Sequence, residues 1–299
     1  MLLLTDTIDF SMKNQRSKYI ISILAITLAS LVQASSWTGG GTADDWNDTA
    51  NWLNGEVAGL AVDDNALFVG AEDSNTPTAD FTFADSGADV NLRAEVTLTI
   101  NNVTISGFDV WRLGGNNGHG GGHLVLNGGT LNGGELLVAS AAGATSDSSL
   151  TVTGGRLVTD SFDVNALGLF TLTGDAATFS VGNTSFENGS RVNFIFDSTG
   201  ISSIATSGVF TIGASSAELN IDLTHFAGSG VFDLVTFGSV TGSYRTDNIT
   251  YTGLAGRSAS IEYDDDRMSV RVSIPEQRAY ALIAGCFGLS AVMLRRRRS

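Results

Sequence analysis

The chain has 299 residues, of which 42% are hydrophobic and 16% charged, with 36 glycines but only two prolines. Between positions 35 and 274 there are eight arginines, no lysine and 28 acidic residues, a formal charge of −20. This charge argues against nucleic acid as a partner, and the hydrophobic content argues against disorder. The single cysteine, Cys286, lies outside the acidic region, which therefore depends on burial and hydrogen bonds instead of disulfides.

Residues 1–34 have the organisation of a secretory signal peptide. Three basic residues at positions 13–18 precede an apolar run over 19–31, and small residues ending at Ala34 offer a cleavage site. Two aspartates among the first eleven residues do not suit such a leader, so Met12 is the better start. A membrane span is the alternative, but 13 apolar residues suit a cleaved leader better. We expect a signal helix that is removed on export.

Residues 35–94 contain three of the four tryptophans, in a stretch rich in glycine, asparagine and aspartate. We expect a β cap in which Trp37, Trp46 and Trp52 stack over the first turn of the following domain and shield its apolar end. Because indole rings also stack well on sugar rings, Trp46 and Trp52 are candidate carbohydrate contacts.

Residues 95–215 contain a repeat. Similar segments begin at Leu124, Leu150, Phe170 and Val192, which are 26, 20 and 22 residues apart. Each carries alternating apolar residues followed by a turn, and each has a second short strand, at 135–138, 161–164 and 179–181 in the first three copies. A period of 20–26 residues with two or three short strands predicts a β-solenoid, because one unit cannot bury its apolar side alone.

The paired glycines of this repeat mark its corners. Gly128-Gly129 and Gly154-Gly155 follow the first strand of two successive copies, where glycine tolerates positive φ. The alternative fold is a β-sandwich of hairpins, since Asn127-Gly128 also suits a hairpin turn. We predict an all-β parallel β-helix, with strands near 217–223, 231–237 and 259–273 forming a second β cap over 216–273.

The repeat region resembles the short repeats of autotransporter passenger domains and related bacterial surface proteins, which are parallel β-helices. The Trp-rich segment before it is similar to the opening module of such surface proteins. The resemblance implies an extended exported domain. It also brings polysaccharide lyases into consideration, because some enzymes of that class have this fold.

Residues able to perform chemistry are few. His119 and His123 flank a glycine-rich loop with no third metal ligand nearby, so no metal site is predicted. Calcium is the one ion considered, through the acidic residues at 44–48 and 63–64, although the usual calcium loops are missing. Asp163 and Asp175 are the nearest approach to a carboxylate pair for a lyase. We expect no cofactor and no catalytic residues.

Residues 274–299 form a membrane-retention device. Pro275 and Glu276 precede sixteen apolar residues, 279–294, which would form about 24 Å of transmembrane helix, a little short of the bilayer core. The stop-transfer signal that follows consists of Arg295, Arg296, Arg297 and Arg298. Arginines stay on the cytoplasmic side, so the acidic domain is expected outside the inner membrane.

This order of elements resembles the PEP-CTERM sorting signal of Gram-negative bacteria, with Gln277 in place of the second proline of its motif. The resemblance implies recognition of Pro275 and Glu276 by exosortase, a membrane protease, after export. It further implies a membrane-anchored intermediate and a final place at the cell surface or in an extracellular matrix rich in exopolysaccharide.

The sequence therefore predicts an exported, non-enzymatic structural or adhesive protein of the cell surface or matrix. Its expected partners are exosortase, exopolysaccharide and, through the C-terminal helix, the inner membrane. A polysaccharide-binding, lectin-like surface protein is one alternative, and a β-helix polysaccharide lyase is the other.

Overall fold

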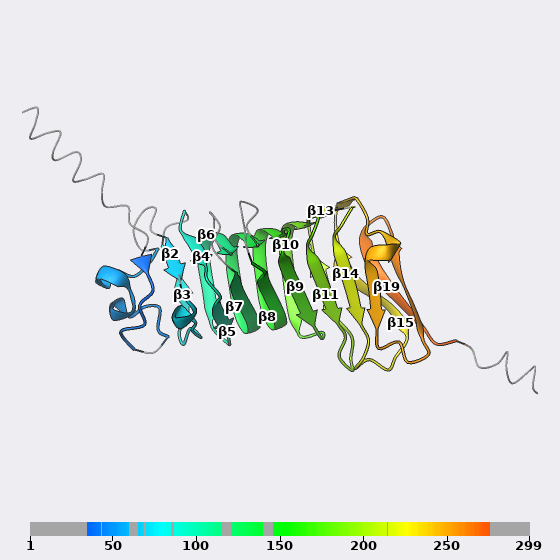
Figure 1. Ribbon diagram of the computed structural model, residues 1–299, viewed down its shortest axis with the longest axis horizontal. Helices are drawn as coiled ribbons and strands as arrows, with labels where there is room; N and C mark the ends of the chain where they lie inside the picture. Colours follow the sequence, from blue (N-terminus) through cyan, green and yellow to red (C-terminus); the bar gives the residue numbers. More distant parts are fainter. Residues whose placement is uncertain are drawn as a thin grey trace, which may run out of the picture.

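The protein is an elongated parallel β-solenoid (Figure 1). The computed structural model describes residues 35–42, 44–59, 65–68, 70–84, 87–114, 121–139, 146–213 and 215–275. The predicted signal helix, Ala34 and the C-terminal transmembrane helix lie outside these residues. Among the residues described, no helix has the length and apolar character needed to span a membrane.

Three parallel sheets, here called faces A, B and C in chain order, form the sides of the solenoid. Face A contains β5 (Val96–Ile100), the beginnings of β7 (Gly122–Val138) and β8 (Ser148–Val164), then β9 (Gly168–Thr173), β11 (Arg191–Ile195), β14 (Glu218–Asp222) and β17 (Ile249–Thr252). Face B contains β3 (Phe81–Thr82), the beginning of β6 (Thr104–Leu113), the middles of β7 and β8, and the first half of β10 (Ala177–Phe186).

Face C completes each coil. It contains β1 (Ser35–Ser36), β2 (Ala66–Phe68), β4 (Asp89–Leu92), the ends of β6, β7, β8 and β10, then β13 (Val209–Ile212) and β16 (Ser239–Thr241). Because all neighbouring strands of the three faces run parallel, the sandwich of hairpins is wrong and the solenoid is confirmed.

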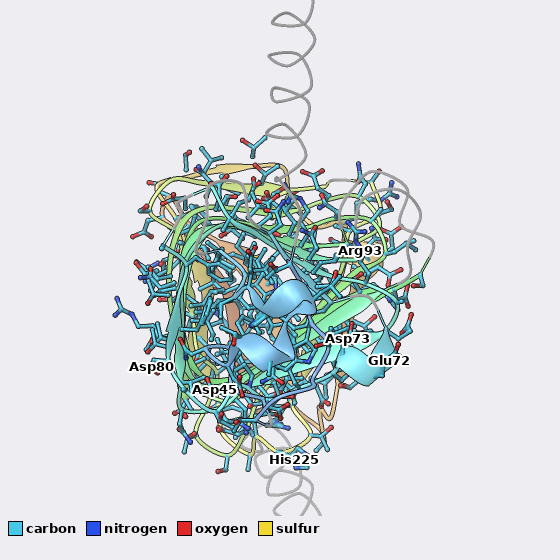
Figure 2. All side chains as sticks on the ribbon, turned by 90° about the vertical axis from the view of Figure 1, so that its left-hand side faces the viewer. Asp45, Glu72, Asp73, Asp80, Arg93 and His225 are labelled. Atoms are coloured by element: carbon cyan, nitrogen blue, oxygen red, sulfur yellow. The ribbon has the colours of Figure 1, made fainter. Side chains whose placement is uncertain are left out.

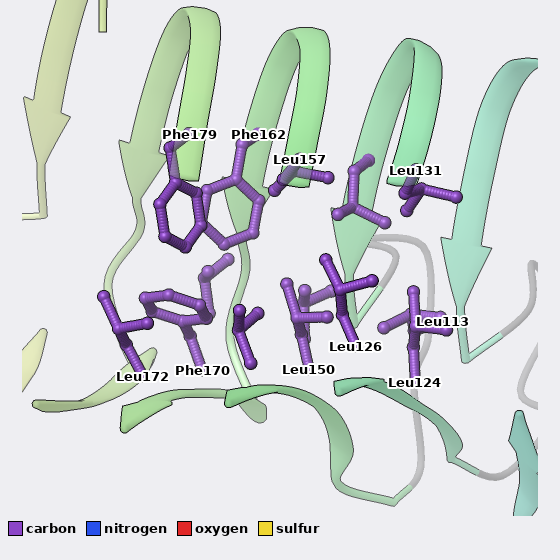
Figure 3. Close-up of a cluster of buried hydrophobic side chains, with 14 of the residues drawn as sticks. Leu113, Leu124, Leu126, Leu131, Leu150, Leu157, Phe162, Phe170, Leu172 and Phe179 are labelled. Atoms are coloured by element: carbon purple, nitrogen blue, oxygen red, sulfur yellow. The ribbon is translucent and has the colours of Figure 1, made fainter. Parts of the chain in front are cut away.

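The register confirms the repeat that the sequence predicts. Leu124, Leu150, Phe170 and Val192 are successive partners on face A, so their side chains form one column. All four are at most 1% exposed. Figure 3 shows Leu124, Leu150 and Phe170 of this column together with neighbours that include Leu126 and Leu172, filling the interior between the faces. Since each coil covers the apolar side of the next, the core is continuous along the solenoid.

The paired glycines turn the chain from face A to face B, as predicted. Gly129 has φ +68° and Gly155 has φ +83°, a left-handed conformation that favours glycine. A Cβ atom on Gly129 would lie 2.1 Å from the carbonyl oxygen of Val103 in the preceding coil. Glycine is therefore required both by the backbone conformation and by the close approach of adjacent coils.

One of the predicted second strands belongs to a different face. Residues 135–138 and 161–164 pair with each other on face C, as the repeat suggests. Residues 179–181, however, pair with 157–159 on face B, and the face C partner of 161–164 is 183–186. Residues 179–181 do form a strand, but the step from Phe170 to its face B position Phe179 is nine residues, two more than the step from Leu150 to Leu157, so this strand lies on face B.

The solenoid extends beyond the predicted interval 95–215 in both directions. Parallel pairing begins with β1 and β2, so much of 35–94 belongs to the coils. Near the C-terminus β14, within the predicted cap strand 217–223, pairs in parallel with both β11 and β17. Alternation of apolar residues is the same in cap and coil strands, so the sequence does not mark where the coils begin and end.

The two ends are closed differently. At the N-terminus the chain between β1 and β2 contains two 3₁₀ helices, η1 (Thr49–Asn51) and η2 (Leu53–Gly55). At the C-terminus a four-stranded sheet has the order β12 (Ile204–Ala205), β15 (Gly230–Thr236), β19 (Arg267–Ser273) and β18 (Ser258–Tyr263). Strands β18 and β19 are antiparallel, and residues 264–266 connect them.

Candidate functional site

The candidate sorting motif begins directly after the last strand. Ile274 and Pro275 follow β19 and are exposed, and Pro275 lies beside Thr224 and Arg257 at the edge of a shallow pocket. Glu276 and the four arginines at 295–298 lie outside the described residues, as does Ala34 at the predicted cleavage site. The structure thus places only the beginning of the motif, at an accessible position at the C-terminal end of the rod.

The candidate carbohydrate contacts Trp46 and Trp52 are in the core. Their side chains are 0% and 2% exposed, and Trp46 stacks on Trp111 of β6 with ring centroids 6.2 Å apart. The indole nitrogen of Trp46 donates to Oδ1 of Asn75 at 3.1 Å, and that of Trp52 donates to the carbonyl of Trp46 at 2.8 Å. Neither ring offers a face to a sugar, so their assignment as carbohydrate contacts is wrong.

The acidic residues considered for calcium accept hydrogen bonds from the backbone, Asp44 from the N–H group of Thr76 at 3.2 Å and the others within their own loop. Both carboxylate oxygens of Asp48 accept backbone hydrogen bonds, from Thr42 at 2.7 Å and from Ala50 at 2.9 Å, and these lower the pKa of Asp48. Asp45 accepts from the backbone of Asn47 at 2.9 Å. Within the described residues no three His, Cys, Asp or Glu side chains gather closely enough to hold a metal ion. Residues 63–64 lie outside that part of the chain.

His123 belongs to a hydrogen-bonded chain across three coils of face A. Its Nε2 lies 3.0 Å from Oε2 of Glu95, and its Nδ1 lies 2.8 Å from the hydroxyl of Ser149. The hydrogen bond with His123 lowers the pKa of Glu95. His119 lies outside the described residues. The sequence search missed this trio because the residues are 26 and 28 positions apart and meet only through the coil register.

This trio resembles a nucleophile with its base and carboxylate, so the surroundings of Ser149 decide its chemistry. Acyl transfer needs backbone N–H groups aimed at the developing oxyanion. The nearby N–H groups of Gly121 and Gly122 instead donate to the hydroxyls of Ser146 and Ser148. Adjacent coils also place outward side chains about 4.8 Å apart, which accounts for the contacts without a catalytic role. We therefore interpret the trio as a link between coils.

Asp163 is a half-buried carboxylate on face C. Burial raises its pKa to about 6, and the carboxylates of Glu135 and Glu187 add to the increase. Asp175, its proposed partner in a lyase, is exposed after β9 at the corner between faces A and B. The structure thus places the two aspartates on different sides of the solenoid, which is not the arrangement that a carboxylate pair flanking one glycosidic bond requires.

The outer surface of the rod is mainly polar, with charged side chains distributed around it (Figure 2). On face A the middle outward column consists largely of hydroxyl and amide side chains, which succeed one another in register: Thr99, Val125, Thr151, Thr171, Asn193, Asn220 and Thr250. Asn193 donates to Thr171 in this column at 3.3 Å. Regular coil spacing thus converts scattered Thr and Asn residues into a ladder of hydrogen-bonding groups.

A groove lies on the last coils of this face. It has a volume of about 410 Å³ and is floored by β11 and β14. Its wall is the 3₁₀ helix η4 (Thr246–Asn248), which precedes β17. The side chains of interest here are Leu169, Arg191, Asn193, Glu218, Asn220 and Asp247. The sequence did not indicate this groove, because its residues come from four separate strands and a short helix.

Comparison with known proteins gives no further assignment: no protein-family model, curated protein or solved structure matches the chain.

Proposed function

We propose that the protein is an exported, non-enzymatic structural or adhesive component of the bacterial cell surface or extracellular matrix. The observation that carries the proposal is the solenoid itself, a rod with a continuous apolar core and outward ladders of Thr, Ser and Asn. Such ladders make many weak hydrogen bonds along an extended partner. A net charge far from zero keeps such a surface soluble between contacts.

The sequence at the two ends supports export and anchoring. A leader-like segment precedes β1, and the tail with its apolar run and four arginines follows β19 directly. Exposure of Ile274 and Pro275 is compatible with access by a membrane protease such as exosortase. In this proposal the tail holds the protein at the inner membrane until it is processed, and the rod then reaches the surface or the matrix.

A polysaccharide-binding role is the second candidate, and the groove beside η4 is the observation that favours it. Its lining of amides, carboxylates and one arginine offers both donors and acceptors of hydrogen bonds. This role would supply a specific contact within the same surface protein.

Surface labelling of intact cells tests the proposal. Ala176 is exposed at a corner of the solenoid, and Cys286 is the only native cysteine. In a Cys286→Ser background, the Ala176→Cys variant should react with a membrane-impermeant maleimide on intact cells expressing the full chain. The same variant without residues 1–34 should react only after lysis. Equal protection of both proteins until lysis would contradict exposure at the cell surface.

A further inference from the structure

The groove beside η4 contains a polar atom that the protein does not satisfy. Oδ1 of Asn220 is buried and has no hydrogen-bond partner among the described residues. Leaving a buried acceptor unpaired costs about 1–3 kcal/mol, so buried acceptors are normally paired with a donor of the protein, of water or of a ligand. Because this atom has almost no solvent-accessible surface, it can receive a donor from a ligand in the groove once the amide of Asn220 turns toward the opening.

The charges around Asn220 disfavour an anionic ligand. Glu218 and Asp247 bring two carboxylates to the groove, whereas Arg191 is the one cation lining it. The guanidinium of Arg191 already binds the carboxylate of Asp147 at 2.6 Å. Asp247 is itself bound by Arg245 at 3.1 Å, so the like charge that an anion would meet comes mainly from Glu218. A phosphate or a uronic acid would therefore meet a carboxylate and a cation that is already paired.

The same groups suit a ligand that carries hydroxyls. A hydroxyl donates to a carboxylate or to Oδ1 of Asn220, and it accepts from an amide N–H or a guanidinium. Asn193 and Asn220 are direct partners in the register of β11 and β14, so their amides lie on adjacent coils. Leu169 adds an apolar contact at one side of the groove, suitable for the C–H surface of a sugar ring.

The dimensions agree with a short oligosaccharide. The groove crosses β9, β11, β14 and β17, and strands about 4.8 Å apart give it a length of roughly 14 Å. Its volume falls within the range of sites for small ligands. A polymer can also continue beyond it along the ladder of Thr and Asn residues on face A.

We propose that this groove binds an uncharged oligosaccharide segment, with Asn220 accepting a sugar hydroxyl at its floor. The proposal deepens the proposed function and depends on it only for the source of the polysaccharide, since it assigns the site and the ligand class. The candidate sugar-binding site is therefore the polar surface of the last coils and not the buried tryptophans of the N-terminal cap.

The test is the affinity of the full chain, in detergent micelles, for soluble polysaccharides measured by calorimetry or affinity electrophoresis. The probes are dextran and galactomannan, which are uncharged, and polygalacturonate, which is anionic. We expect binding to at least one uncharged polymer and weaker or no binding to polygalacturonate. Asn220→Leu should weaken that binding about tenfold or more, the effect of one or two lost hydrogen bonds.

Asn132→Leu is the matched control. It makes the same chemical change at an exposed position on face B, away from the groove. If Asn220→Leu does not fold, Glu218→Ala replaces it, with Asp160→Ala as its control, since both residues are exposed. The proposal is overturned if neither uncharged polymer binds, if polygalacturonate binds more tightly, or if groove and control variants behave alike. Surface labelling that persists without sugar binding would reject the groove and leave the proposed function standing.

Discussion

The two ends of the solenoid are closed by different means. At the N-terminal end Trp37, Trp46 and Trp52 are all at most 5% exposed and pack against one another and against the aromatic rings of the first coils. At the C-terminal end the hairpin of β18 and β19 covers the last coil, but Tyr251 and Ile261 there are only partly buried. Strand β16 at this end is exposed along its whole length.

This difference indicates which interactions hold each end. Aromatic burial closes the N-terminus, whereas the C-terminus combines buried apolar side chains of β15 and β19 with polar contacts to the backbone. The clearest of these is Arg257, whose guanidinium lies 5.9 Å from the ring of Phe226. It donates to the backbone carbonyls of Leu223, Phe226, Gly228, Gly253 and Leu254. A single side chain thereby joins the last two coils close to the point where the chain continues into the predicted sorting tail.

The largest effect is expected from removing an indole of the N-terminal cap. Trp46→Ala should lower the free energy of unfolding by about 3–5 kcal/mol, because it opens a cavity against Trp111 and leaves Oδ1 of Asn75 without its donor. Urea denaturation followed by circular dichroism measures this change. Leu53→Ala in the same cap is the control and should stay within about 0.5 kcal/mol, since Leu53 is 46% exposed. Equal losses for the two variants would refute the role assigned to the tryptophans.

A smaller loss is expected at the opposite end. Arg257→Met keeps the length of the side chain but leaves several carbonyls without a donor, which should cost about 2–3 kcal/mol. Hydrogen exchange should then accelerate in β17 and β18 and stay unchanged in β2 and β4. As a control, Arg271→Met removes an exposed contact with Glu262 and should change little. Faster exchange throughout the rod would mean that Arg257 does not act locally.

The middle of the rod contains a half-buried carboxylate, Asp163. The pKa of Asp163 is raised to about 6, so the folded protein binds a proton there more tightly than the unfolded chain. Its contribution to stability is therefore complete at acidic pH, below about 4, and is lost as the pH rises through about 6. Asp163→Asn should be more stable than the wild type by about 1–2 kcal/mol at pH 7.5, allowing for partial solvent screening.

Thermal denaturation of Asp163→Asn and wild type at pH 4 and 7.5 measures this difference, which should nearly vanish at pH 4. Asp160→Asn makes the same change at an exposed position and is the matched control. A stabilisation by Asp163→Asn that is equal at both pH values would show that the carboxylate is not protonated preferentially in the folded state.

The smallest effect is expected at the exposed edge. Val240 of β16 is 37% exposed, whereas Val90 of β4, on the same face near the N-terminus, is fully buried. Val240→Ala should change the free energy of unfolding by no more than about 0.5 kcal/mol, and Val90→Ala should lower it by about 2 kcal/mol. Comparable losses would indicate that the C-terminal end is covered as completely as the N-terminal end.

The sequence predicts the architecture of this protein well because the architecture repeats. Apolar alternation, the spacing of Leu124, Leu150 and Phe170, and the paired glycines each point to stacked coils, and the register confirms them. The boundaries were less accessible, since cap and coil strands have the same alternation. Burial of Trp46 was also undecided, because an indole suits both a core and a sugar-binding surface.

The candidate site was not predictable in the same way. Asn193 and Asn220 are register partners 27 residues apart, whereas the register partner of Asn220 in the next coil is Thr250. Asp247 reaches the groove only because it lies in η4, so the proximity of these residues is not visible in the sequence. The trio of Glu95, His123 and Ser149 was missed for the same reason. Residues that repeat in sequence were found, and residues that meet only across coils were not.

We propose that the protein leaves the cytosol and is retained by its tail. The most direct test compares the full chain with a variant in which residues 274–299 are replaced by a soluble epitope, by fractionating cells into inner membrane, periplasm, surface and medium. We expect the full chain in the inner membrane and at the surface or in the matrix. The variant should be released into the periplasm. An identical distribution of the two proteins would contradict the account.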